Sequence, residues 1–131
     1  MNMIIIEFIP HEQQRYCTAG DWTFDHQGNL KISVSDLGDL DAQIDVAIHE
    51  LIEARLCQKH DITDHAVTMF DIQFEREREA GIHSITDEPG DNIDAPYHNE
   101  HQSATFVERA AASVLGVDWE KYDEKLNELR Q

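Results

Sequence analysis

The sequence has few cysteines and no long hydrophobic segment. Its only two cysteines, Cys17 and Cys57, cannot build a disulfide framework, so we expect a reduced, cytoplasmic protein with two free thiols. The short apolar run MIIIEFI is interrupted by Glu7 and no basic segment precedes it, so we expect no secretory signal. No stretch approaches the roughly 20 apolar residues that a membrane-spanning helix requires. We therefore expect no membrane partner.

Basic residues are also scarce. The chain has 10 lysines and arginines against 27 aspartates and glutamates, which gives a formal net charge of -17. A surface of this charge repels polyanions and offers few cations to displace the counterions of a phosphate backbone. We therefore expect no nucleic-acid partner, whereas mimicry of DNA or binding of a cation is compatible with this composition.

The residues that are present predict one α+β domain over residues 1–131. A chain of 131 residues fits a single domain. Strand patterns occur in MIIIEFI and in residues 22–36, where the second pattern turns at residues 27–29 as a hairpin. An N-terminal strand and a hairpin together predict a short antiparallel sheet.

Helical patterns follow the predicted sheet. Apolar residues recur at helical spacing over about residues 40–60 and leave few faces of that helix exposed, so we expect it to be central. Thr63 is suited to cap a second helix that ends near Gly81, and a third helix should run from Pro96 to about residue 115. Asp118 is suited to cap a final amphipathic helix.

The predicted central helix carries the motif His49-Glu50-Leu51-Ile52-Glu53. His49 and Glu53 are four residues apart, so they project from one helix face on successive turns, as two ligands of one metal ion would. Glu50 points about a quarter turn away and could act on a metal-bound water as a general base. Burying such groups is costly without a partner, which favours a metal site here.

A further ligand must come from another segment, and the sequence YHNEH offers His98 and His101. They lie one turn apart on the predicted third helix, and His101 ranks slightly first because it is nearer to the apolar side of that helix. Either could bind the metal, and the other could then serve as an acid or an oxyanion donor. We expect zinc first, with manganese, iron or magnesium as alternatives because carboxylate ligands favour harder ions.

Other charged positions have simpler interpretations. Arg55 and Glu108 fall near the centres of the apolar stripes of their helices, which predicts a buried ion pair between them. Asp71 and Glu75 share a helix face that we interpret as a solvated edge. The segment TDEPGDNID lacks the ligand spacing of an EF-hand, so we expect a flexible acidic loop that could border a pocket.

Several segments carry a resemblance to known proteins. HELIEA, FDIQFE, DEPGD, APYHNEH and GVDW together resemble a family of small proteins encoded by bacteria and their phages, and the match covers most of the chain. More distantly, HELIE after a small sheet is similar to the zincin-like metallopeptidases. That resemblance implies His49 as a ligand, Glu50 as the base and residues 30–35 as a strand edge that aligns a substrate. Glu53 stands where those enzymes have a second histidine.

Two rival interpretations use the same residues. Glu50-x-x-Glu53 followed by Asp71 and Glu75 is similar to the carboxylate motifs of all-helical nucleotide pyrophosphohydrolases of the MazG type, in which magnesium binds a triphosphate. Alternatively, the chain is a non-catalytic phage module that binds a host protein and holds a structural metal with four protein ligands.

The preferred prediction is a zincin-like, metal-dependent hydrolase acting on a peptide or a small molecule. In it, Glu50 activates water at a metal held by His49, Glu53 and His101 or His98.

Overall fold

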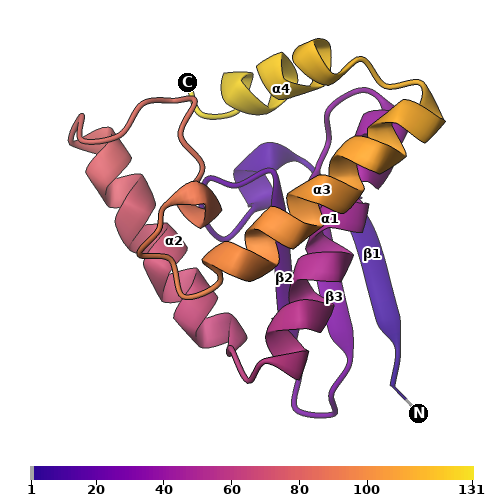
Figure 1. Ribbon diagram of the computed structural model, residues 1–131, viewed down its shortest axis with the longest axis vertical. Coiled ribbons are helices and arrows are strands. Elements are labelled where there is room, and N and C mark those ends of the chain that lie inside the picture. Colours follow the sequence, from indigo (N-terminus) through magenta and orange to yellow (C-terminus); the bar gives the residue numbers. More distant parts are fainter. Residues whose placement is uncertain (1) are drawn as a thin grey trace.

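The computed structural model describes residues 2–131 and has an α+β fold (Figure 1). Three strands come first: β1 (Ile4–Ile9), β2 (Gly20–Phe24) and β3 (Leu30–Ser35). Four helices follow: α1 (Leu40–Lys59), α2 (Asp64–Glu79), α3 (His98–Leu115) and α4 (Trp119–Glu128). Two short 3-10 turns, η1 (His11–Gln13) and η2 (Pro89–Asp91), lie in the connections. The predicted class and helix order are confirmed.

The sheet is mixed, with the strand order β1-β3-β2. β2 and β3 form the predicted antiparallel hairpin, but β1 runs parallel to β3, so the prediction of an all-antiparallel sheet was wrong. The connection that contains η1 carries the chain to the far edge before the hairpin returns it beside β1. β3 is therefore the central strand, and the prediction that residues 30–35 form a substrate-aligning edge was also wrong.

The predicted caps Thr63 and Asp118 are confirmed, and Asp39 caps α1 in the same way. Asp39, Thr63 and Asp118 each accept a hydrogen bond from a backbone N–H in the first turn of α1, α2 and α4. Gly116 ends α3 with φ of 74°, a left-handed conformation that glycine adopts without strain. α3 begins at His98 rather than at the predicted Pro96.

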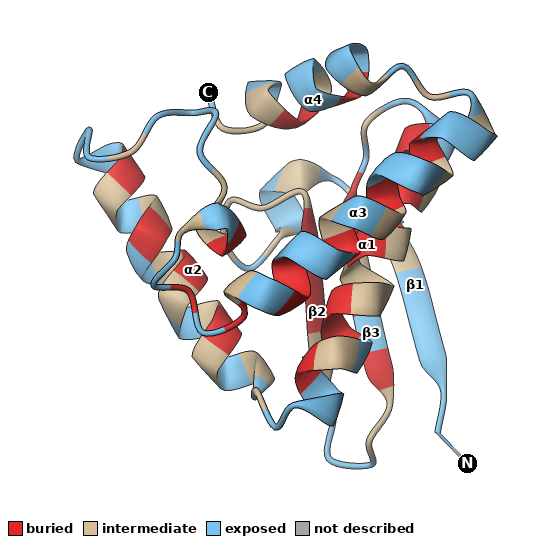
Figure 2. Cartoon of the chain, in the orientation of Figure 1, coloured by how far each residue is buried: buried red, intermediate tan, exposed pale blue. Residues whose placement is uncertain are grey.

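The hydrophobic core lies between α1 and one face of β2 and β3 (Figure 2). Ile32 and Val34 on β3 are fully buried, and Ala54 and Cys57 of α1 belong to the same buried cluster. The side of α1 that faces α3 is different, because it buries Asp45, His49 and Glu53. This polar interior between two helices positions the candidate metal ligands. Within residues 2–131, no helix is long and apolar enough to cross a membrane.

Candidate metal centre

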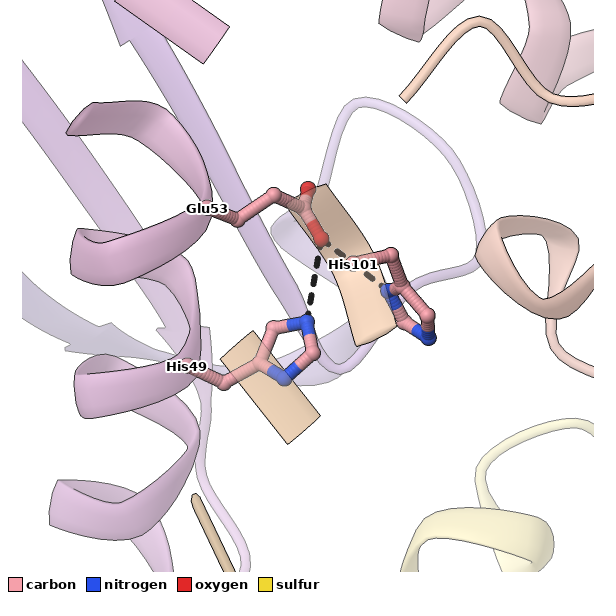
Figure 3. A group of neighbouring side chains, drawn as sticks. All are labelled: His49, Glu53 and His101. Atoms are coloured by element: carbon pink, nitrogen blue, oxygen red, sulfur yellow. Dashed lines mark hydrogen bonds and ion pairs between the residues drawn. The ribbon is translucent and has the colours of Figure 1, made fainter. Parts of the chain in front are cut away.

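His49, Glu53 and His101 meet at one carboxylate oxygen (Figure 3). Glu53 Oε2 lies 3.0 Å from His49 Nε2 and 3.0 Å from His101 Nδ1. All three residues are buried, and the two imidazole rings are 4.7 Å apart. His49 and Glu53 therefore project from one face of α1, as their spacing predicted. The packing of α3 against α1 brings His101 to them.

The outward nitrogens of the two histidines are also held by carboxylates. His49 Nδ1 lies 2.7 Å from Glu108 Oε1, and His101 Nε2 lies 3.0 Å from Glu88 Oε2 and 3.3 Å from Asp91 Oδ1. Each imidazole thus has one nitrogen directed at Glu53 and the other fixed by an outer carboxylate. Histidines that bind metals are typically oriented in this way, because the outer acceptor fixes the ring and raises its basicity.

Glu53 is held in place by a residue of the sheet. The indole Nε1–H of Trp22, on β2, donates a hydrogen bond of 3.0 Å to Glu53 Oε1, which leaves Oε2 directed at the histidines. Burial opposes ionisation of Glu53, but the hydrogen bonds from His101 and His49 keep its pKa well below the usual range. The carboxylate is therefore ionised and available as a ligand.

The surrounding carboxylates favour the charged form of both histidines in the metal-free protein. Burial opposes protonation, yet the hydrogen bonds of His49 to Glu108 and Glu53 raise its pKa well above the ordinary value. The pKa of His101 is raised in the same way by Asp91, Glu53 and Glu88. A cation that binds here replaces these protons, so binding must release protons.

The donor set fits a divalent transition metal. His49, Glu53 and His101 each offer one ligand atom, and these atoms lie within 4.8 Å of one another. Two imidazoles and one carboxylate suit zinc, and they also suit iron or manganese. Three protein ligands leave a coordination position open for water. Glu88, Asp91 and His101 meet the same distance criterion, but Asp91 is exposed.

Glu50 faces the same cavity. The cavity has a volume of about 90 Å³ and is lined by all three candidate ligands and by Glu50, so it accommodates water and one small group. Within the described residues, the Glu50 carboxylate has no hydrogen-bond partner. Burial raises its pKa well above the usual value, and the nearby charge of Glu53 adds to this effect. A carboxylate with a raised pKa beside a bound water is suited to take up a proton.

Gly20 on β2 permits this placement of Glu50. A Cβ at position 20 would lie 2.5 Å from Glu50 Oε1 and 2.6 Å from its Cγ. Any larger residue would therefore displace Glu50, because such contacts are far inside van der Waals distance.

The structure does not bring His98 to the candidate metal centre. His98 is the first residue of α3, and its Nδ1 donates to the carbonyl oxygen of Gly90 at 3.0 Å. It thereby joins α3 to η2 and belongs to neither group of clustered donors within the described residues. Of the two predicted histidines, His101 is the one that meets His49 and Glu53.

Two other interpretations from the sequence were wrong. Arg55 is exposed and donates to Gln58, and Glu108 pairs with His49 and accepts from the hydroxyl of Tyr122 instead. Asp71 is not on a solvated edge, because it is buried and accepts hydrogen bonds from Tyr16 and Tyr97.

Sequence reasoning missed four residues that orient the ligands, which are Trp22, Glu88, Asp91 and Glu108. The position of Glu108 on an apolar helix stripe did indicate that its carboxylate has a buried partner. The predicted partner was Arg55, whereas the observed one is His49. Glu88 and Asp91 come from the acidic loop and η2, where no periodicity indicates the direction of a side chain.

Comparisons with protein-family models, with curated proteins and with solved structures found no match for this chain. The resemblance to zincin-like metallopeptidases therefore depends on the motif alone and stays a prediction. The MazG-type interpretation expects an all-helical fold, and the three-stranded sheet contradicts that expectation. Its second pair of carboxylates is also engaged elsewhere, because Asp71 binds two tyrosines and Glu75 pairs with Arg78.

Proposed function

We propose that this protein is a metal-dependent hydrolase in which His49, Glu53 and His101 bind one divalent cation and Glu50 is the general base. One observation carries the proposal: two imidazoles and a carboxylate converge in a cavity beside a carboxylate that has no partner of its own. A structural metal would require no such free carboxylate, so its presence favours catalysis over a purely structural role.

The cation would supply a water molecule of lowered pKa, and zinc is the first candidate for it. Glu50 would accept the proton of that water, since its raised pKa makes it a stronger base than an exposed glutamate. Glu108 and Glu88 would hold the histidines in position during this transfer.

The cavity limits what can react. Its volume of about 90 Å³ admits the reacting group of a substrate rather than a whole molecule, so the remainder must lie outside. A peptide or a small ester or amide, of which only the scissile bond enters, satisfies this limit. The surrounding carboxylates disfavour a phosphate group, which agrees with the scarcity of basic residues.

The substitution Glu50→Gln tests the proposal. Purified protein loaded with zinc or manganese is assayed against peptide and ester libraries, and its metal content is measured in parallel. We expect the variant to keep its metal and to lose at least about 100-fold in the rate of hydrolysis, because glutamine cannot accept the proton. Glu120→Gln, at an exposed position of α4, is the matched control and should leave the rate unchanged.

Two results would contradict the proposal. One is the absence of turnover by the metal-loaded parent protein with every library, which would favour the host-binding module with a structural metal. The other is an unchanged rate in the Glu50→Gln variant, which would remove Glu50 from the mechanism.

A further inference from the structure

β1 is an edge strand, and most of its residues are exposed (Figure 2). Ile4, Ile6 and Phe8 are 61%, 45% and 42% exposed. They pair in register with Leu30, Ile32 and Val34 of β3, so they lie on the face of the sheet that holds the core. The core face of the sheet therefore continues into solvent at β1.

The backbone of β1 is open along the same edge. Met3 O accepts from Leu30 N at 2.9 Å, and Ile9 O accepts from Asp36 N at 2.7 Å. In a parallel pair, alternate residues direct their backbone groups to the neighbouring strand, so the odd-numbered residues of β1 face β3. The N–H and C=O groups of Ile4, Ile6 and Phe8 consequently point outward. An exposed apolar edge of this kind is a template for another strand.

We propose that β1 pairs antiparallel with β1 of a second copy of this chain, about a twofold axis at Ile6. The sheets of the two copies then join into one, and the uncovered stripe of each copy extends that of the other. A twofold contact uses the same surface patch on both partners, so it requires a strand that is complementary to itself.

The register supports this self-pairing. With the axis at Ile6, Ile6 lies opposite Ile6, and Ile4 lies opposite Phe8, so residues with outward backbone groups meet each other. A shift in one direction places Pro10 opposite Ile4, where proline has no N–H to donate. A shift in the other direction places Phe8 opposite the polar Asn2. The register at Ile6 is thus the one that pairs the whole apolar stripe.

Charge favours the same contact. Glu7 is the only charged side chain in residues 2–10, and Lys31 Nζ lies 3.1 Å from its Oε1. In the proposed register Glu7 faces Ile5 rather than another carboxylate. Because the chain carries a net charge of -17, two copies repel each other least where this nearly uncharged strand is the meeting surface.

Sedimentation equilibrium of the full chain tests the proposal. We expect a mass that rises with concentration to twice the 15.1 kDa of one chain. Ile6→Pro removes an outward N–H without breaking a hydrogen bond to β3, so it should give a folded monomer. Ile6→Lys should do the same by placing like charges at the axis, and circular dichroism melts check that both variants fold. Phe106→Lys, on the exposed side of α3, is the matched control and should still dimerise.

Hydrogen exchange provides a second readout. The amides of Ile4, Ile6 and Phe8 should exchange at least about tenfold more slowly at concentrations where the dimer forms than at concentrations where the chain is monomeric. A single-chain mass at every concentration would overturn the proposal. So would a dimer that persists in both Ile6 variants or that Phe106→Lys abolishes.

Discussion

At the scale of the residue, Glu53 organises the candidate metal centre. Its two carboxylate oxygens have different partners. Oε1 accepts a hydrogen bond from Trp22, and Oε2 faces His49 and His101. The outer carboxylates of Glu88 and Glu108 then fix the two rings. The positions of all three candidate ligands are therefore determined by neighbours that would not themselves bind the metal.

Residue types and spacing could predict part of this arrangement. His49 and Glu53 are related by helix geometry alone, so their joint projection follows from the sequence. Periodicity ranked His101 slightly ahead of His98, because His101 is nearer to the apolar side of α3, but it does not define where α3 crosses α1. The partners of Asp71 were equally hidden, because Tyr16 and Tyr97 approach it from distant segments.

Asp45 supplies a prediction of pH dependence. Its side chain is fully buried, and within the described residues neither carboxylate oxygen has a hydrogen-bond partner. Burial raises the pKa of Asp45 to about 7, and the charge of Glu108 adds to this effect. Between its ordinary pKa of about 3.9 and pH 7 the folded state keeps a proton that the unfolded chain has released. Stability therefore falls as the pH rises through this interval, and the loss is complete above about pH 7.

Asp45→Asn should remove that loss, because asparagine stays neutral. We expect the variant to gain about 1–3 kcal/mol in the free energy of unfolding at pH 8 and clearly less at pH 5, where only part of the loss has occurred. Thermal unfolding of the metal-free protein at both pH values measures the difference. An equal effect at the two pH values would contradict a buried charge at this position.

At the scale of the element, the site depends on how α1, α3 and η2 meet. The helices were predictable because their apolar periodicity and capping residues agree. The direction of β1 was not, because alternation in a strand indicates its faces and not its neighbours. The sheet matters to the site through β2, which brings Trp22 to Glu53 and Gly20 to Glu50.

Gly90 tests the contact between η2 and α3. A Cβ at this position would overlap the imidazole of His101, so Gly90→Ala must displace either the ring or the turn. We expect metal affinity to fall by about 10-fold or more, as for other disturbances around a ligand. Isothermal titration with zinc measures the change.

Gly20→Ala is the matched substitution for Gly90→Ala. It disturbs Glu50 rather than a ligand, so zinc affinity should stay near that of the parent while hydrolysis is lost. If the Gly90→Ala variant binds zinc as tightly as the parent, close packing against Gly90 does not hold the His101 ring in place.

At the scale of the whole molecule, a bound cation should stabilise the fold. It would join α1 to α3, the two helices that bury the polar interior of the chain. A ligand that binds only the folded state at about 100 times its dissociation constant adds about 2.7 kcal/mol to the free energy of unfolding. We expect chelation to lower the midpoint of thermal unfolding by roughly 10 °C.

The chelated protein should remain folded at room temperature, because the two histidines keep their carboxylate partners. Differential scanning calorimetry with and without a chelator measures the shift, and restoring zinc should reverse it. An unfolding midpoint that changes neither on chelation nor on restoring zinc would contradict a bound metal.

Metal content is the most direct test of the central claim. Elemental mass spectrometry is applied to the parent protein and to His101→Ala and His98→Ala, two substitutions of the same kind one helical turn apart. We expect about one divalent metal per chain in the parent and in His98→Ala, and almost none in His101→Ala. A parent protein without metal after zinc loading, or equal metal content in all three proteins, would contradict the account.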